Sequence, residues 1–490
     1  MHIKIATLSL MLMTILSSYV QAVSLPNTMT NGSVADADEI NANFTALGNA
    51  INDLEGGVFV TNNISLSNND NGLRNTIFGY FAGKNLLSTA LNNTAIGYKA
   101  LNSNTSGDGN IANGAYSLYK NTSGSNNMAQ GTQALTNNTV GSNNIAKGYQ
   151  ALYSNTRASN NIANGNKSLY YNTQGQNNIA NGNKALFSNT TGNDNIATGY
   201  QALISNAIGR NNIAMGYQAL LSNTTGQGNI AMGNNALFLN TTAYNNIAIG
   251  HAVLSDNTTG VNNTAVGSSA LLLNTTGYNN TALGDIALIA NKTGYYNTAV
   301  GYDALNINAF GYINTALGVS AGPTSDNLKN TTALGYDAKV EVSDKVRIGN
   351  TNVSIIEGQV AFSASSDRRL KEDITTTTLG VDFINDLNPV QYHRINNENT
   401  DIEMGIIAQE LAKVLKKHQM TELGMINQVG DGYMSVRYND LFAPLIKSVQ
   451  ELSAENTRLK VKTITMETQI FNIKKELDEL KKLLMKRVQH

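Results

Sequence analysis

Cysteine and tryptophan are absent from this sequence, and only four of its 490 residues are proline. Without cysteine, the chain has no disulfide framework and no cysteine-based metal site. Charged side chains make up only 14% of the residues and leave a net charge of −1, so there is no electrostatic basis for binding nucleic acid or an anionic membrane. We therefore expect no cofactor, no metal and no nucleic-acid partner. The length exceeds that of one ordinary domain.

The scarce charges are unevenly distributed along the chain. Residues 1–339 contain 13 Lys or Arg and 13 Asp or Glu, so the last 151 residues hold 20 of the 33 basic and 21 of the 34 acidic side chains. A shift of this size indicates two regions that fold in different ways. The change falls close to residues 365–374.

The N-terminus has the layout of a secretory signal peptide. Met1-His2-Ile3-Lys4 is a short basic start, residues 5–20 form an apolar run, and Val20-Gln21-Ala22 provides a small-residue cleavage site. A membrane anchor is the alternative, but a spanning helix needs about 20 apolar residues and this run is shorter. We therefore predict a signal peptide at 1–22, a secreted or cell-surface location, and no stable membrane insertion after the signal is removed.

Residues 23–58 are predicted to contain a short helix. Its apolar side chains recur at alternating steps of four and three, the spacing of a heptad seam: Ile40, Phe44, Leu47, Ile51 and Leu54. A seam this short is not stable alone in water. We expect it to pack against copies of itself or against the next domain.

From residue 59 to residue 358 the sequence is dominated by a repeat. A glycine in the step Ala-x-Gly recurs every 17 residues from Gly97 to Gly335, which gives 15 markers without an insertion or deletion. Gly79 is a first copy, displaced by one residue. A fixed period of this kind indicates stacked units. The abundant Asn, Gly and Thr disfavour helix, and short apolar runs between turns favour strands. The prediction is a mainly β fold, a β-solenoid or β-roll shaft with parallel strands in register.

The composition of the repeat fits this geometry. A charged residue would face its own copy in the next unit at about 4.8 Å, costing roughly 1 kcal/mol even in water, whereas Asn and Thr hydrogen-bond along the stack. The many Asn-x-Thr triplets match the glycosylation sequence, but stacked amides explain them more simply. The Ala-x-Gly units at 75–335 resemble the head domains of trimeric autotransporter adhesins. That resemblance implies a homotrimeric, surface-exposed β-roll.

Residues in the repeat that carry chemistry are few. A glycan-cleaving shaft needs two carboxylates at a defined separation, yet no Glu occurs between Glu55 and Glu341. Asp303 and Asp337 share a phase of the repeat two units apart. Six tyrosines follow the marker glycine and form either a stacking surface for sugars or packing rows: Tyr98, Tyr149, Tyr200, Tyr217, Tyr302 and Tyr336.

The repeat is followed by two stretches, residues 346–349 and 353–360, that are predicted to be short strands closing the coil. Beyond them, Ser366 and Lys371 are the candidate catalytic pair. A serine nucleophile needs a base, and a lysine serves when burial or nearby positive charge depresses its pKa. Two arginines lie between the two residues. A step of five does not align two side chains on one helix face, so either a turn or a contact between chains must bring them together.

Three sequence blocks resemble the intramolecular chaperone domain of phage endosialidase tailspikes, the self-cleaving S74 peptidase family. They are Ser366-Asp367-Arg368-Arg369-Leu370-Lys371-Glu372-Asp373-Ile374, Gly405-Ile406-Ile407-Ala408-Gln409-Glu410 and Tyr433-Met434-Ser435-Val436-Arg437-Tyr438-Asn439-Asp440-Leu441. The resemblance implies a small α+β domain at 359–443 that assists trimerisation, with Ser366 as nucleophile and Lys371 as general base. It also implies cleavage at a peptide bond flanking Ser366, and we favour the bond between Ser366 and Asp367. Residues 411–423 lack the proline often found in this family.

The C-terminal residues 444–490 are predicted to form a trimeric coiled coil. Pro444 suits a first helical turn, and two interleaved seven-residue series follow it over about 40 residues. The series are Leu445, Leu452, Leu459, Met466, Ile473 and Leu480, and Val449, Asn456, Thr463, Ile470, Leu477 and Leu484. The alternative is one amphipathic helix on a globular domain.

These features predict an exported, homotrimeric, adhesin-like fibre. Its C-terminal domain is expected to act as an intramolecular chaperone for trimerisation and then to release itself by autoproteolysis. Nothing in the sequence indicates action on an external substrate, and surface glycans or host-cell receptors are the expected partners beyond the chain itself. Two other interpretations stay open. One is a tailspike-like glycan-binding or glycan-degrading protein with the same self-cleaving domain. The other is a membrane-tethered protein that releases a signalling fragment, against which the lack of a second apolar span counts.

Overall fold

The computed structural model describes residues 58–61, 64–69, 74–353, 355–360, 365–395, 402–421, 424–428 and 432–488. The chain divides into two compact units, Met1–Ile348 and Gly349–His490. The predicted signal peptide at 1–22 and the predicted helix at 23–58 lie outside the described residues, except for Val58. The domain limits at 358 and 443 stay predictions.

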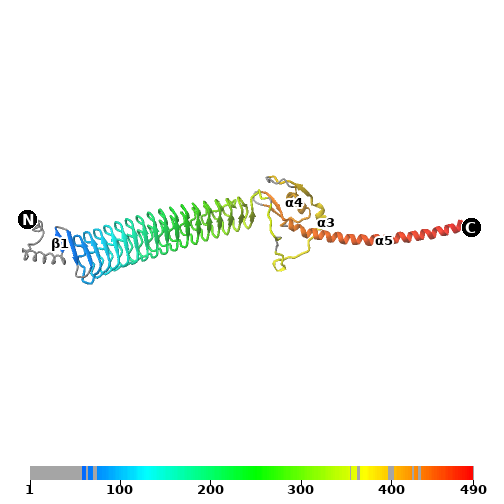
Figure 1. Ribbon diagram of the computed structural model, residues 1–490. Coiled ribbons are helices and arrows are strands. Elements are labelled where there is room, and N and C mark those ends of the chain that lie inside the picture. Colours follow the sequence, from blue (N-terminus) through cyan, green and yellow to red (C-terminus); the bar gives the residue numbers. More distant parts are fainter. Residues whose placement is uncertain are drawn as a thin grey trace, which may run out of the picture. The chain divides into compact units, whose positions relative to one another are not determined.

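The first unit is a β-solenoid, which confirms the fold predicted from the 17-residue period (Figure 1). It opens with antiparallel pairing of β1 (Val58–Thr61), β2 (Ile64–Asn69) and β3 (Asn75–Phe78). From β3 onward every strand of the 19-stranded sheet pairs in parallel with the next, and we call residues 75–348 the solenoid and each 17-residue turn a rung. The following strands are β4 (Thr94–Ile96), β5 (Ile111–Asn113), β6 (Met128–Gln130), β7 (Ile145–Lys147), β8 (Ile162–Asn164), β9 (Ile179–Asn181), β10 (Ile196–Thr198), β11 (Ile213–Met215), β12 (Ile230–Met232), β13 (Ile247–Ile249), β14 (Thr264–Val266), β15 (Thr281–Leu283), β16 (Thr298–Val300), β17 (Thr315–Leu317), β19 (Thr332–Leu334) and β21 (Val346–Ile348). A separate pair is formed by β18 (Gly322–Pro323) and β20 (Lys339–Val340).

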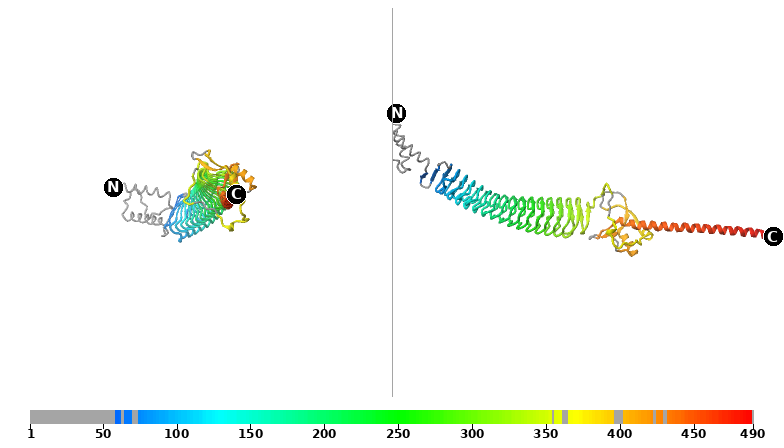
Figure 2. Two further views of the ribbon diagram at one scale, coloured as in Figure 1. Left: turned by 90° about the vertical axis from the view of Figure 1, so that its right-hand side faces the viewer. Right: turned by 90° about the horizontal axis from the view of Figure 1, so that it is seen from below.

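The core of the solenoid is a column of small side chains. In the rung that contains β11, the central strand residue Ala214 points inward together with Ala219 and Leu220, and all three are fully buried. The same three positions are buried in neighbouring rungs, because each strand residue pairs with the residue 17 positions later. Alanine fits here because the two sides of a rung lie close together. Figure 2 shows the resulting stack from two further sides.

The turns of each rung depend on residues with positive φ. Gly216 has φ of 145°, and a Cβ placed on it would lie 2.4 Å from the carbonyl oxygen of Gly233 in the next rung. Only glycine fits this column, because the backbones of successive rungs touch there. Gln218 and Leu220 also have positive φ, 54° and 52°. A leucine in this region is strained by its own Cβ, and its complete burial in the core holds it there.

Two ladders of buried asparagines run along the inside of the solenoid. Asn212 donates from Nδ2 to Oδ1 of Asn195 at 3.1 Å and to the carbonyl of Gly226 at 2.8 Å. Asn223 donates to Oδ1 of Asn206 at 2.8 Å and to the same carbonyl at 3.1 Å. Both side chains are fully buried. This confirms the predicted stacking of amides, and it excludes glycan attachment at Asn223, although Asn223-Thr224-Thr225 matches the acceptor triplet.

The second unit is a small α+β region, as predicted. It contains η1 (Arg368–Leu370), α3 (Val381–Asp386), β22 (Pro389–Tyr392), β23 (Glu403–Ile406), α4 (Ala408–Lys417), β24 (Ile426–Gln428), β25 (Met434–Val436), η2 (Tyr438–Leu441) and α5 (Phe442–Val488). The four strands form two antiparallel pairs, β22 with β23 and β24 with β25. The core consists of Leu379, Phe383, Leu411, Leu415, Met425 and Leu441.

One of the two predicted closing strands is wrong. The strand at 346–349 exists as β21, but the described residues of 353–360 form no strand. Gly349 has φ of 75°, a turn conformation that takes the chain away from the direction of β21. Ile355 and Ile356 are then 67% and 55% exposed, and this segment adds no strand to the sheet after β21.

The long helix α5 covers the region predicted to form a coiled coil. Pro444 is its third residue, in the first turn as expected. Val381 at the start of α3 donates its backbone N–H to Oε2 of Glu451 at 2.9 Å, which ties α5 to the core of the second unit. Farther along, the seam residues Leu459, Ile470 and Leu477 are about half exposed. One long exposed seam is consistent with a coiled coil. None of the described helices is both long and apolar enough to cross a membrane.

Candidate functional site

A short turn positions the candidate catalytic pair. Asp367 caps η1, because its Oδ1 accepts a hydrogen bond from the backbone N–H of Arg369 at 2.8 Å. The backbone N–H of Lys371 then donates to the carbonyl of Arg368 at 3.1 Å, which ends the 3₁₀ turn. The chain therefore reverses direction between Ser366 and Lys371.

This reversal places the two side chains in contact. Nζ of Lys371 donates a hydrogen bond to Oγ of Ser366 at 2.7 Å. The sequence left open whether a turn or a neighbouring chain joins them, and the structure joins them within one chain. A distance of 2.7 Å lies within reach for proton transfer between a hydroxyl and an amine. The roles of the two residues in cleavage stay predictions.

Asp367 is a functional candidate that the sequence reasoning overlooked, apart from its place beside the cleavage bond. Besides capping η1, its carboxylate binds the guanidinium of Arg369, with Oδ2 2.8 Å from Nη2. The side chain of Arg369, followed by its backbone N–H, lowers the pKa of Asp367 below its ordinary value. The signal for this role was present, because Asp two residues before a turn N–H is a common cap.

The whole segment around the pair is open to water. All residues from 365 to 376 are exposed in the single chain, including Ser366 and Lys371. The sequence named two conditions that favour a lysine base, burial and nearby positive charge. The single chain does not provide burial, while two arginines lie between the pair in the sequence.

The other two sequence blocks pack against each other. The block at 405–410 includes the end of β23 and the start of α4, and the block at 433–441 includes β25 and η2. The hydroxyl of Tyr438 accepts a hydrogen bond from the backbone N–H of Ile406 at 3.0 Å. A Cβ on Gly405 would lie 2.4 Å from the same hydroxyl, so the glycine leaves room for the ring. These blocks therefore act as structural supports of the small α+β core.

Two aspartates of the solenoid that share a phase have separate partners. Oδ2 of Asp303 accepts a hydrogen bond from Nδ2 of Asn306 at 2.8 Å. Asp337 pairs with Lys339 at 3.2 Å. Each carboxylate thus has a local partner of its own, and neither of these contacts links the two aspartates to each other.

The six predicted tyrosines are exposed, by between 40% and 68%. Tyr200 and Tyr217 stack with their ring centroids 5.5 Å apart. Further stacks, which the sequence reasoning did not single out, join Tyr153, Tyr170 and Phe187, and Tyr278, Tyr295 and Tyr312. Among the six predicted tyrosines, Tyr200 and Tyr217 therefore pack against each other along the solenoid while both stay exposed.

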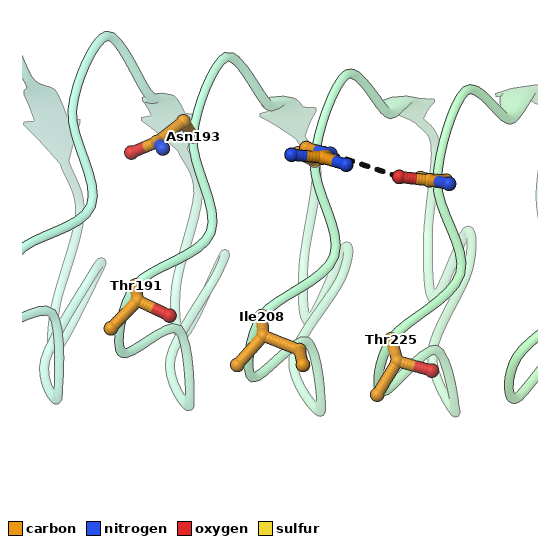
Figure 3. A pocket seen from close by; sticks show the side chains of 6 residues that line it. Thr191, Asn193, Ile208 and Thr225 are labelled. Carbon is orange, nitrogen blue, oxygen red and sulfur yellow. Dashed lines mark hydrogen bonds between the residues drawn. The ribbon is translucent and has the colours of Figure 1, made fainter.

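A shallow pocket of about 380 Å³ lies on the turns of three successive rungs (Figure 3). Its lining consists of Thr191, Asn193, Ile208, Arg210, Thr225 and Gln227. Nε of Arg210 donates to Oε1 of Gln227 at 2.9 Å, the contact drawn in the figure. No carboxylate belongs to this lining, so the pocket offers hydrogen bonds but no group for acid–base hydrolysis.

A parallel β-solenoid followed by a small α+β unit and a long helix is the architecture of a tailspike-like or fibre-like protein. Within it, residues 366–420 match the peptidase S74 family model, described as the chaperone of endosialidase. The match begins at Ser366 and lies C-terminal to the solenoid, which confirms the predicted resemblance to this family; it includes the first two sequence blocks, whereas the block at 433–441 lies beyond its end. The family combines intramolecular chaperones with self-cleaving peptidases and is associated with trimeric assembly. No curated protein matches the chain. The resemblance of the rungs to adhesin heads stays a prediction.

Proposed function

We propose that this protein is an exported trimeric fibre whose C-terminal unit guides trimer assembly and then cuts itself off. The observation that carries the proposal is the 2.7 Å hydrogen bond between Lys371 and Ser366 at the start of the segment that matches the peptidase S74 family. Ser366 is the nucleophile, Lys371 is the general base, and the bond between Ser366 and Asp367 is cleaved.

The chemistry follows the Ser–Lys pattern. The neutral amine of Lys371 takes the proton of the Ser366 hydroxyl while Oγ attacks the carbonyl carbon of the scissile bond. The C–N bond breaks, and Lys371 gives the proton to the departing amine of Asp367. Water then hydrolyses the ester and regenerates the hydroxyl. Attack by Oγ on the carbonyl of its own residue would close a four-membered ring, so we place the attacking Ser366 on a neighbouring chain of the trimer.

Trimer assembly would determine when cleavage occurs. In one chain the segment from 365 to 376 is exposed, and an ammonium in water holds its proton. Neighbouring chains in a trimer would cover the segment, remove water and favour the neutral amine. Cleavage would then follow trimerisation and would not precede it.

The solenoid has a physical need for such a chaperone. Its rungs are nearly identical, so chains that meet shifted by one rung make almost the same contacts. Long parallel pairings also form slowly and are prone to misassembly. The exposed seam of α5 has a seven-residue period, but the polar Asn456 and Thr463 interrupt its apolar series and would favour one register. Once the C-terminal unit leaves, the finished fibre is trapped kinetically.

Export rests on the signal-peptide pattern at residues 1–22, and the released fibre would act in adhesion or display at the cell surface or after secretion. Surface glycans or host-cell receptors are its expected partners. A glycan-degrading role receives less support, because Asp303 and Asp337 are engaged separately and the pocket of Figure 3 has no carboxylate.

The test is expression of the mature chain from residue 23, followed by light scattering and intact mass measurement. We expect a trimer in which each chain is split into two fragments, with the mass of the larger fragment ending at Ser366. A folded trimer that stays at full length would refute self-cleavage. Co-assembly of wild-type chains with tagged Ser366→Ala chains tests attack between chains, because the tagged chains should also be cut.

A further inference from the structure

The flat outer face of the solenoid sheet is unusually apolar for a surface. In each strand of the main sheet from β3 to β21, three residues pair with a neighbouring parallel strand. The first and third of them point outward, as Ile230 and Met232 do in β12. Over the 17 strands, 21 of these 34 positions are occupied by Ile, Leu, Val, Met or Phe. Every strand contributes at least one. Met215, Met232 and Leu283 are about 40% exposed.

Charge is almost absent from the same face. Lys147 is the only charged side chain at the 34 outward strand positions. The solenoid does carry charges elsewhere, for example at Lys120, Asp256 and Asp303. The row that contains Leu239 on the return side of the rungs includes both Lys120 and Asp256. The two sides of the rung therefore differ in charge although both expose some apolar side chains.

We infer that this outer strand face, from Thr76 to Ile348, is the surface through which copies of the chain pack against one another along the solenoid. The inference rests on the proposed trimer and identifies where its chains meet. A second copy is the partner that fits best, because the face repeats at every rung. A copy that is parallel and in register meets each rung with the same rung.

Identical residues facing each other explain the absence of charge. Like charges placed in contact repel by roughly 1 kcal/mol per pair even in water, whereas apolar side chains facing their own copies gain from burial. The single Lys147 can extend its ammonium to the rim. A surface that binds an unrelated charged partner has no such reason to exclude charge from every strand.

The size of the face also matches a stable interface. Seventeen strands at about 4.8 Å give a length of about 75 Å. A standard protein interface uses about 20–30 residues on each side. The 21 apolar positions fall in this range, and the polar remainder is mostly Thr and Asn, which are neutral. One face of this length therefore suffices for stable association.

Cysteine cross-linking tests the inference, because the natural chain contains no cysteine. Met232→Cys is on the strand face, and Leu239→Cys is on the return side of the same rung. The two residues are matched in exposure, at 38% and 39%. Each full-length variant is compared with the wild type by circular dichroism and light scattering and then treated with a thiol-specific cross-linker that spans about 10 Å, the usual distance between packed sheets.

We expect both variants to remain trimeric, with roughly ten-fold more covalently linked chains for Met232→Cys than for Leu239→Cys, because facing sheets lie about 10 Å apart. Trimers that link through Leu239→Cys and not through Met232→Cys would overturn the inference and leave the proposed trimer standing. Single chains in light scattering of the wild type would overturn both.

Discussion

Lys371 and Ser366 form a 2.7 Å hydrogen bond across a 3₁₀ turn, although residues five apart do not share a face of an α-helix. Five residues separate them, and the 3₁₀ turn capped by Asp367 closes that distance within one chain. The pair is assembled within the single chain, and the segment that holds it is exposed to water. The contact between the two side chains and the removal of water that would activate the lysine are thus separate requirements for the proposed cleavage.

Replacing either member of the pair should stop release of the C-terminal unit. In Ser366→Ala and Lys371→Ala we expect cleavage to fall by at least about 100-fold, the usual loss when a general base is removed. The time course of the full-length band on a denaturing gel measures it. Lys371→Arg is the matched control, because arginine keeps the positive charge and hydrogen-bond donors but cannot act as a base. Cleavage in Lys371→Arg at the wild-type rate would contradict the assignment of Lys371.

The cap on the turn should affect the rate of cleavage more than its occurrence. Asp367→Ala removes the acceptor for the N–H of Arg369, so the turn spends less time closed and cleavage should slow several-fold. Asp367→Asn keeps an oxygen acceptor and should remain closer to the wild type. Rates of fragment formation under identical conditions compare the two variants. Equal slowing in both would show that the charge of Asp367, and not its cap, matters.

Replacing a buried asparagine of a ladder should lower the free energy of unfolding more than replacing an exposed residue of the same rung. Asn212→Ala leaves both the backbone N–H and Nδ2 of Asn229 without the oxygen they share, at 3.0 and 3.2 Å. Unsatisfied buried donors cost about 1–3 kcal/mol. Thr225→Ala, on the surface of the same rung, should change stability by no more than about 0.5 kcal/mol. Denaturant unfolding of the released fibre measures both, and similar losses would argue against the ladder.

Acid should unfold the C-terminal unit before the solenoid. Lys417 and then His418 lower the pKa of Asp386 below its ordinary 3.8, and the backbone N–H of Val381 lowers the pKa of Glu451 below 4.5. Groups whose pKa falls on folding stabilise the folded state above the ordinary pKa. They lose this contribution as the pH falls through the lowered value. The buried side chains that join the rungs of the solenoid, such as Asn212 and Asn223, are amides and do not titrate in this range.

Thermal unfolding followed by circular dichroism between pH 7 and about pH 3, where carboxylates titrate, tests this difference. The midpoint of the helical signal should fall with pH more steeply than the midpoint of the solenoid. Asp386→Asn should flatten the dependence of the helical signal. A helical unit that is as insensitive to acid as the solenoid would contradict the prediction.

The regular part of the fold was predictable because its physics is local. A strict 17-residue period, alanine in the strand centre and glycine after it are enough to predict stacked parallel strands with amide ladders. The sequence did not reveal that Gln218 and Leu220 adopt positive φ, because only the packed stack stabilises that conformation. It also misled at 353–360, where an apolar run looks like a strand but has no partner.

The candidate site was predictable in composition and only partly in geometry. The spacing of Ser366 and Lys371 allowed two ways of meeting, and the choice depended on the side chain of Asp367 capping a turn. Under the proposed trimer, burial of the pair would come from other chains, which no single sequence pattern reports. The outer strand face escaped attention for a similar reason, since its apolar residues alternate between two positions and no single row is apolar throughout.

The column of glycines that includes Gly216 and Gly233 has a consequence for evolution. Each glycine touches the backbone of the next rung, so a change in length that moved another residue into the column would put a side chain where only hydrogen fits. From Gly97 to Gly335, duplication or loss of a whole rung of 17 residues, about 4.8 Å of length, keeps every glycine of the column in place. The length of the solenoid can therefore change by duplication while its cross-section stays constant.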